Sequence, residues 1–121
     1  MPRTRLAETI RRLEAYAEAG ADCLYAPGVR SFPDVEAIVR AVVPKPVNVL
    51  VGGGYFTVAQ LTDVGVRRIS VGGALARAAF TGFLAAAREI AEQGTFTALS
   101  RTISVPELNG LFSSIGRHDA C

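Results

Sequence analysis

A unit that occurs three times along the chain limits its possible folds more than any other feature. Each unit is a short apolar run, then glycine, then a stretch with apolar residues at helical spacing. The apolar runs cover residues 23–26, 47–51 and 68–71, and the helical stretches cover about residues 31–42, 57–64 and 74–93. Apolar runs as short as these predict buried strands. Their regular alternation with helices over short connections predicts a parallel sheet with right-handed crossovers.

The segments before and after these units are predicted to be helical in part. Apolar residues recur at helical spacing from Leu6 to Ala17 and predict an N-terminal helix. After Gly94 the periodicity ends, and Ser104 with Glu107 three residues later matches a capping box at the start of a short helix. Residues 113–121 are expected to be frayed. No linker separates these parts, so we predict one domain over residues 1–121, with residues 94–121 as a C-terminal helical extension.

The number of predicted strands is too small for a closed barrel. A complete (β/α)8 barrel takes roughly 250 residues, and this chain has 121. Three parallel strands leave two unpaired sheet edges. The expected fold class is therefore α/β, a partial TIM (β/α)8 barrel of three βα units. A fragment, a truncated gene product and a half that completes itself by association remain three alternatives.

Composition argues against several classes of partner. The net charge is +2 and the charges are scattered, without the basic block and interleaved aromatics of a nucleic-acid-binding protein. There is no signal-peptide pattern and no apolar stretch of membrane-spanning length, so a cytoplasmic protein is expected. Cys23 is expected to be a buried thiol and Cys121 part of a frayed end, with no metal-ligand spacing. His118 lies in the tail and is a poor candidate for a general base.

Glycines at the strand ends are the strongest candidates for a binding site. The second predicted strand is followed by Gly52, Gly53 and Gly54, and the third by Gly72 and Gly73. Ligands of parallel α/β sheets bind at the carboxyl ends of the strands, where glycine lets backbone N–H groups approach an anion. Any one of these glycines alone is better explained by a tight turn. The two clusters on consecutive strands favour a phosphate or carboxylate site.

Other side chains are weaker candidates. Arg77 lies one helical turn beyond the last glycine cluster, where a guanidinium reaches a bound anion, although a solvated helix residue explains it equally well. Asn48 lies within a strand and either points into a barrel centre or is a hydrogen-bonded interior residue. Tyr25 and Tyr55 are more often core or loop residues than cleft residues. Asp22 precedes its strand, at the end opposite to catalysis in barrels, and is expected to be a turn residue.

Three segments resemble the C-terminal half of the isocitrate lyase/phosphoenolpyruvate mutase superfamily. They are residues 11–28, residues 46–50 and residues 66–79, and the stretch from Arg67 to Arg77 is the most specific. The resemblance runs from about Leu6 to Phe112 and implies that the three strands correspond to the sixth, seventh and eighth strands of that family's barrel. It also implies a homo-oligomer, because family members commonly exchange a C-terminal helix between subunits.

The resemblance implies a reaction as well as a fold. Members of this family cleave C–C bonds of 2-hydroxy acids or rearrange P–C bonds, and they stabilise an enolate on magnesium. Arg77 matches an arginine that contacts the substrate in methylisocitrate lyases. Pro27 stands where the family has a glutamate near the metal, and Leu50 and Gly52 stand at an Asn-x-Thr motif. These departures resemble the mutase-like branch of the family.

The same comparison implies that much of the catalytic apparatus lies outside this chain. The magnesium-binding aspartates, the catalytic cysteine loop and a carboxylate-gripping arginine belong to earlier parts of the barrel. No catalytic residue and no metal are therefore expected in this chain alone. The leading hypothesis is a truncated lyase or phosphomutase that is inactive alone. The second is a non-catalytic, self-associating half-barrel that binds a small carboxylate, phosphonate or phosphate. A third, another phosphate-binding barrel such as an aldolase, leaves the motif from Arg67 to Arg77 unexplained.

Overall fold

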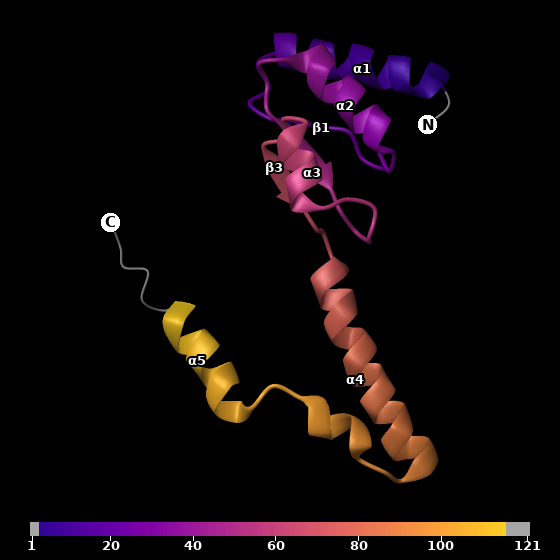
Figure 1. Cartoon of the computed structure of the whole chain (residues 1–121), viewed down its shortest axis with the longest axis vertical. Helices are drawn as coiled ribbons and strands as arrows, with labels where there is room; N and C mark the ends of the chain where they lie inside the picture. Colours follow the sequence, from indigo (N-terminus) through magenta and orange to yellow (C-terminus); the bar gives the residue numbers. More distant parts are fainter. Residues whose placement is uncertain (1–2, 116–121) are drawn as a thin grey trace. The chain divides into compact units, whose positions relative to one another are not determined.

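The computed structural model describes residues 3–115 and divides into two compact units, residues 1–76 and residues 77–121 (Figure 1). Whether the two units fold as one domain stays a prediction. The elements along the chain are α1 (Arg3–Glu18), β1 (Leu24–Tyr25), α2 (Phe32–Val42), β2 (Val47–Leu50), α3 (Val58–Asp63), β3 (Arg68–Ser70), α4 (Ala74–Gln93), the 3-10 helix η1 (Thr97–Arg101) and α5 (Val105–Ile115).

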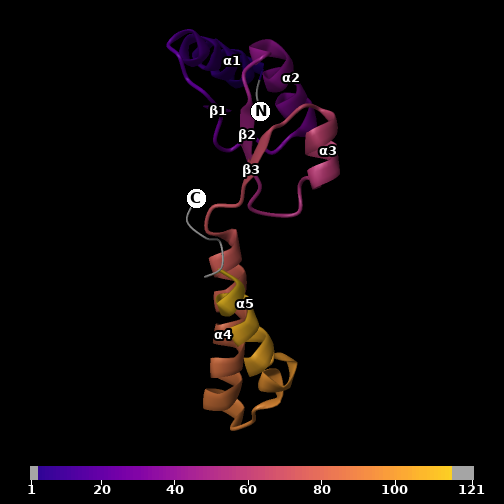
Figure 2. The ribbon, with the colours of Figure 1, turned by 90° about the vertical axis from the view of Figure 1, so that its left-hand side faces the viewer.

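The first unit contains a three-stranded parallel sheet in the order β1-β2-β3. Leu24 pairs with Val47 in the register of β1 and β2, and Asn48 pairs with Arg68 in the register of β2 and β3. Helix α2 connects the first two strands and α3 connects the last two (Figure 2). The α/β class with alternating parallel strands and helices is therefore confirmed, and each strand is shorter than its predicted run.

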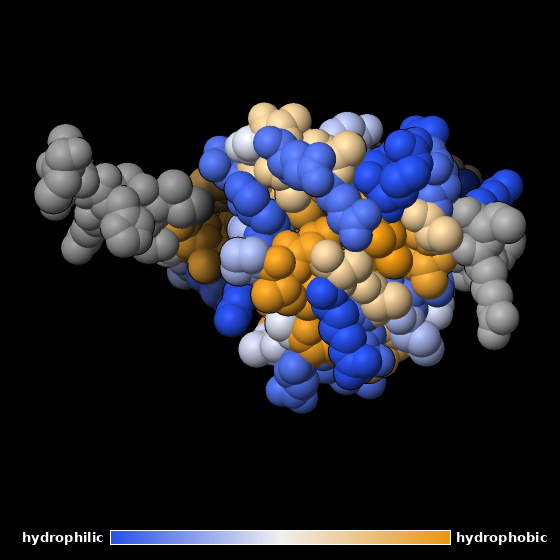
Figure 3. All heavy atoms as spheres, turned by 90° about the horizontal axis from the view of Figure 1, so that it is seen from above, coloured by the Kyte–Doolittle hydropathy of each residue, from blue (hydrophilic) through white to orange (hydrophobic). Residues whose placement is uncertain are grey.

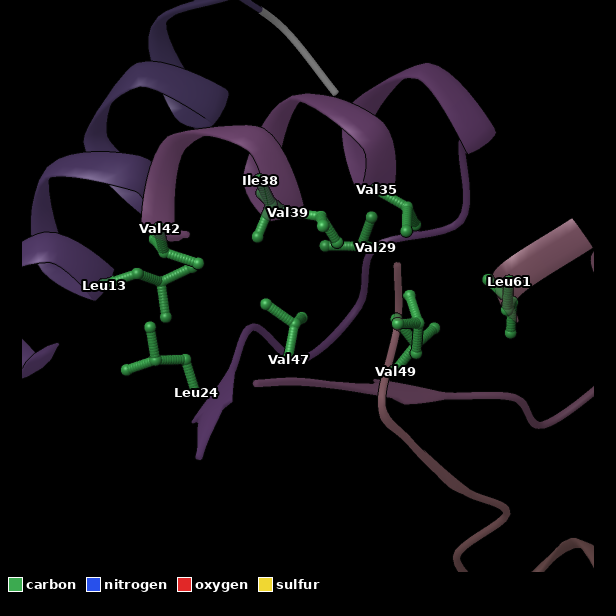
Figure 4. Packing of buried hydrophobic residues seen from close by; sticks show 11 residues of the cluster. Leu13, Leu24, Val29, Val35, Ile38, Val39, Val42, Val47, Val49 and Leu61 are labelled. Carbon is green, nitrogen blue, oxygen red and sulfur yellow. The ribbon is translucent and has the colours of Figure 1, made fainter. Parts of the chain in front are cut away.

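The hydrophobic core lies between one face of this sheet and its helices (Figure 4). Val47 and Val49 point from β2 into this core, because side chains alternate between the two faces of a strand. The helices contribute large side chains that are at most 2% exposed: Leu13 from α1, Ile38 from α2 and Leu61 from α3. Since the helices cover one face only, the side chains of the opposite face have no covering layer within this unit.

The first two helices have the amphipathic character that the sequence predicts. Figure 3, which looks onto α1 and α2, shows hydrophilic side chains interspersed with apolar ones. On α1 the Glu8 carboxylate accepts hydrogen bonds from Arg11 Nε across 2.8 Å and from Arg12 Nε across 2.7 Å. Because these two guanidinium groups stabilise the charged carboxylate, the pKa of Glu8 falls to about 2. The polar side of the helix thus forms a local ion-pair cluster in solvent.

The short helix α3 begins at a complete capping box. The Thr57 hydroxyl accepts a hydrogen bond from the Gln60 backbone N–H across 3.2 Å, and the Gln60 side chain accepts one from the Thr57 N–H across 2.9 Å. Two of the free N–H groups at the helix start are thereby satisfied. Ser31 occupies the corresponding position before α2 but makes no side-chain cap bond.

In the second unit, the end of α4 is tied to the segment that follows it. The Glu89 carboxylate accepts hydrogen bonds from the Thr95 hydroxyl across 2.6 Å and from the backbone N–H groups of Thr97 and Ala98 across 2.7 and 2.8 Å. These bonds, first the one from Thr95, lower the pKa of Glu89 to about 2. They also hold the 3-10 helix over Thr97–Arg101, which the polar, aperiodic sequence did not predict.

The helix expected at the C-terminus is present and longer than expected. The Ser104 hydroxyl accepts a hydrogen bond from the Glu107 N–H across 3.3 Å, which is one of the two bonds of a capping box. Helix α5 continues to Ile115, so the expectation of fraying from residue 113 is wrong as far as residue 115. His118 and Cys121 lie outside the described residues. Between residues 3 and 115, no helix is both long and apolar enough to cross a membrane.

The prediction of a buried Cys23 thiol is wrong, because Cys23 is exposed. The strand begins one residue later than predicted, and Leu24 takes the core position with 1% exposure. Cys23 therefore belongs to the turn before the strand. Its neighbour Asp22 is also exposed in this turn, as the sequence predicted.

Candidate anion site at the carboxyl ends of the strands

The glycine clusters lie in the two loops that leave neighbouring parallel strands. Gly52, Gly53 and Gly54 follow β2, and Gly72 and Gly73 follow β3. All five residues are exposed, and their backbone N–H groups donate no hydrogen bond to any described residue. Since the carboxyl ends of parallel strands share one edge of a sheet, the loops offer unpaired donors at that edge. An anion is the natural acceptor for such donors.

Local geometry accounts for two of these glycines. Gly72 has a φ of +52°, a left-handed conformation that residues with a Cβ adopt at a cost. Gly53 has an ordinary φ, but a Cβ there would lie 3.2 Å from Cε2 of the Tyr55 ring. Turn geometry thus explains Gly72, and close packing against Tyr55 explains Gly53. Neither reason accounts for the N–H groups of both loops that have no acceptor among the described residues.

The loop after β1 adds a cation that the sequence reasoning missed. The Arg30 Cζ lies 5.6 Å from the centroid of the Tyr55 ring, in cation–π contact. This contact joins the loop after β1 to the loop after β2, at the same edge of the sheet. A positive charge two residues beyond Gly28, at a strand end, was the available signal. Tyr55 is a loop residue, 56% exposed.

Helix α4 begins at Ala74, directly behind Gly72-Gly73, as the sequence predicts for a phosphate-type site. The Ala74 N–H donates to the Val71 carbonyl across 3.0 Å and so closes the turn between strand and helix. Arg77 is exposed and lies one turn into α4, where it is the first residue of the second unit. Contact between the Arg77 guanidinium and an anion at the loops stays a prediction.

Asn48 is an interior residue with polar partners. It is 4% exposed and lies on the sheet face opposite the helices. Its Oδ1 accepts a hydrogen bond from Arg68 Nη1, and its Nδ2 donates one to Ser70 Oγ, each across 3.1 Å. The sequence reasoning named neither Arg68 nor Ser70. The available signal was their spacing: two residues apart on one strand, Arg68 and Ser70 share a face of the sheet.

A hollow lies between α1 and the end of β1. It has a volume of about 620 Å³, and no sequence pattern predicted it. Tyr25, 41% exposed, forms part of its wall. The full lining is Arg5, Glu8, Thr9, Arg12, Leu13, Tyr16, Tyr25, Ala26 and Pro27.

Metal ligands are not gathered anywhere in the described part of the chain. Across residues 3–115, no three histidine, cysteine, aspartate or glutamate side chains are close enough together to hold a metal ion. Pro27, at the position where the resemblance led us to expect a glutamate, offers no ligand atom in its side chain. The donors at the strand ends are N–H groups and guanidinium groups, which suit an anion rather than a cation.

Comparison with known proteins identifies the fold as part of a larger one. A crystal structure of a candidate lyase/mutase from Burkholderia cenocepacia J2315 is 47% identical, with a TM-score of 0.82 over 89% of this chain and 39% of that one. A candidate phosphonomutase from the same organism is 39% identical, with a TM-score of 0.62 over 74% of this chain and 34% of that one. Phosphoenolpyruvate phosphomutase from Streptomyces platensis subsp. rosaceus is 29% identical, with a TM-score of 0.68 over 92% of this chain and 39% of that one.

The chain covers less than half the length of these solved structures. It spans 34–43% of the length of the solved structures it resembles, which is part of a TIM barrel. Among curated protein sequences none matches. Residues 1–91 match the family of phosphoenolpyruvate phosphomutase. The chain therefore belongs to the phosphoenolpyruvate mutase/isocitrate lyase superfamily and covers part of its barrel.

Proposed function

We propose that this chain supplies the anion-binding strand ends of a lyase or phosphomutase barrel. The ligand is a small carboxylate, phosphonate or phosphate. One observation carries the proposal: five glycine N–H groups at the ends of neighbouring strands β2 and β3 have no acceptor within residues 3–115. An anion bound there gains hydrogen bonds without requiring the loops to break any.

Positive charge near these loops supports an anionic ligand. Arg30 is held over the Tyr55 ring in the adjoining loop, and Arg77 lies one turn beyond Gly73 on α4. Guanidinium groups bind carboxylates and phosphates in a two-pronged geometry, which gives strong, oriented hydrogen bonds. We assign Arg77 and the five glycines to ligand contact, place Asn48 in the same site, and add Arg30.

Family membership supports a proposal for the reaction class. The solved relatives include a candidate lyase/mutase and a phosphoenolpyruvate phosphomutase, so the reaction of a complete barrel is C–C cleavage or phosphoryl migration through an enolate. Enzymes of this family use magnesium, which stabilises enolate charge when bound. The described residues do not fit a magnesium site, so we assign no step to the metal in this chain. On this proposal the chain by itself binds anions and does not turn over substrate. Its expected location is the cytoplasm.

Calorimetric titration of the chain with inorganic phosphate and with oxalate tests this function. We expect saturable binding of at least one anion, weakened about tenfold or more by Arg77→Ala, because an ionic hydrogen bond is lost. Arg88→Ala is the matched control, since Arg88 is an exposed arginine about three turns further along the same helix. Absence of saturable binding by the unaltered chain refutes the function. Equal losses in the two variants remove Arg77 from the site.

A second function, self-association without catalysis, is favoured by the surface of α4. No described residue of this helix is buried, and Phe80, Phe83 and Leu84 are 62%, 64% and 45% exposed. The first two rings already contact each other edge to face, with centroids 6.3 Å apart. Apolar side chains gathered in this way mark an interaction surface, and a homo-oligomer covers them. Exchange of the C-terminal extension between subunits is one way of forming it.

Sedimentation velocity tests the oligomer directly. We expect a species larger than the 12.8 kDa chain, converted to monomer by replacing Phe80 and Phe83 with serine. Replacing the exposed Tyr16 of α1 with serine is the control and leaves the sedimentation unchanged. A monomer over the whole concentration range contradicts self-association and leaves the anion-binding proposal intact.

A further inference from the structure

Three polar side chains share the face of the sheet that has no helices. Val47 and Val49 point into the core, so Asn48 between them points to the opposite face. The register pairs Asn48 with Arg68 and Leu50 with Ser70 across the β2–β3 ladder. Paired residues of neighbouring strands lie on the same face. Arg68, Asn48 and Ser70 are therefore next to one another there, as their hydrogen bonds also require.

The direction of each hydrogen bond in this group is fixed by chemistry. A guanidinium has donors only, so the Asn48 atom 3.1 Å from Arg68 Nη1 is the acceptor Oδ1. The other end of the amide is then Nδ2, which has donors only. Ser70 Oγ, 3.1 Å from Nδ2, must therefore accept that bond. Arg68 thus determines the orientation of the Asn48 amide, and the amide determines the role of the serine hydroxyl.

This arrangement leaves the hydroxyl hydrogen of Ser70 without an acceptor among the described residues. The hydroxyl has only this single hydrogen to donate. Ser70 is half-buried and lies two residues before Gly72, whose N–H is also unpaired. Asn48 gives one of its two Nδ2 hydrogens to Ser70, and at 4% exposure its amide is nearly closed to a ligand from solvent. The half-buried serine hydroxyl is therefore the more accessible donor for a ligand.

We propose that Ser70 Oγ donates a hydrogen bond to the carboxylate, phosphonate or phosphate bound at Gly72-Gly73, and that Asn48 and Arg68 are positioning residues for it. The proposal rests on the anion-binding function and adds a ligand residue to the same site. Accepting a bond from the Arg68-polarised amide makes the hydroxyl a stronger donor, because consecutive hydrogen bonds polarise one another. On this proposal Asn48 belongs to the site by orienting the serine.

Two substitutions at Ser70 test the contact, with phosphate and oxalate titrated into the whole chain. Ser70→Ala removes the donor, and we expect affinity to fall about tenfold, the usual effect of losing a hydrogen bond to a charged group. Ser70→Thr keeps the hydroxyl and should restore binding to within about threefold of the unaltered chain. Equal affinity of the alanine variant and the unaltered chain overturns the proposal while the anion-binding function stands. Absence of binding by the unaltered chain overturns both.

A substitution at Asn48 tests the positioning. Asn48→Asp has acceptors only, so it accepts from Arg68 and also from the Ser70 hydroxyl, which turns the serine hydrogen away from the ligand. We expect it to weaken binding as much as Ser70→Ala does. The double variant should bind no more weakly than Asn48→Asp alone, because the donor is already lost. If the two losses multiply instead, the aspartate acts by charge repulsion and the positioning role is overturned. Tyrosine fluorescence of each variant checks that the first unit is folded.

Discussion

Replacing Leu24 by alanine should destabilise the first unit more than any change on the open face of the sheet. Leu24 is 1% exposed in a strand of only two residues, and Leu13, Val42 and Val47 belong to the same buried cluster (Figure 4). The substitution removes three carbon atoms, each of which contributes about 0.8 kcal/mol of transfer free energy. A residual cavity adds to this loss. We therefore expect the free energy of unfolding to fall by about 2.5–4 kcal/mol.

Leu50→Ala is the matched control, because it removes the same atoms from the opposite face of the sheet. Leu50 is 37% exposed, so it loses at most about 1.5 kcal/mol of transfer free energy and leaves no closed cavity. Urea titration followed by tyrosine fluorescence measures both variants. The chain has three tyrosines and no tryptophan; since Tyr16, Tyr25 and Tyr55 all belong to the first unit, the signal reports that unit alone.

The comparison of these two variants can refute the assignment of faces. A loss for Leu50→Ala equal to or above that for Leu24→Ala would mean that the open face is the more tightly packed one. The core described between the sheet and α1, α2 and α3 would then be wrong. The comparison requires that the slope of the unfolding free energy against urea concentration is similar in both variants. A changed slope would mean that the substitution altered the compactness of the unfolded or the native state.

Three further predictions concern backbone, caps and pH. Gly72→Ala should cost about 1–2 kcal/mol of unfolding free energy because of the φ of +52°. Gly73→Ala should be nearly neutral in the same urea titration, because the space around the new Cβ is open. Thr57→Ala should cost about 1 kcal/mol by removing the cap of α3, and Ser31→Ala, without a cap bond, much less; equal losses would contradict the cap assignment. The pKa of Glu89 is about 2, below the ordinary 4.5, so its stabilisation of the 3-10 helix is complete above pH 4.5 and lost as pH falls towards 2. NMR amide shifts of that helix should follow this range, and Glu89→Gln should abolish the titration.

The sequence predicted the order and type of the main elements because the signals were local. Apolar periodicity placed α1 and α4, and the glycine after each apolar run placed the strand ends. The capping pair of Ser104 and Glu107 involves residues three apart, so neighbours in sequence were enough to locate the start of α5. These features depend on short-range geometry, which a single sequence shows directly.

Features that depend on contacts across the fold were predicted less well. The contact of Arg30 with Tyr55 and the bonds from Asn48 to Arg68 and Ser70 join residues about twenty or more positions apart. The register of two strands decides such contacts, and a shift by one residue moves every side chain to the other face. The thiol of Cys23 was misplaced for the same reason, since one residue separates it from the buried position of Leu24.

The most direct test of an anion site at the strand ends is a titration followed by the backbone amide signals. With inorganic phosphate or oxalate added to the isotopically labelled chain, we expect saturable shifts of the amides of Gly52, Gly53, Gly54, Gly72 and Gly73, whose N–H groups have no partner in the described part of the chain. The amide of Gly94, a glycine outside the strand ends, should stay constant. Shifts that do not saturate, or that are confined to exposed arginines elsewhere, would contradict the account.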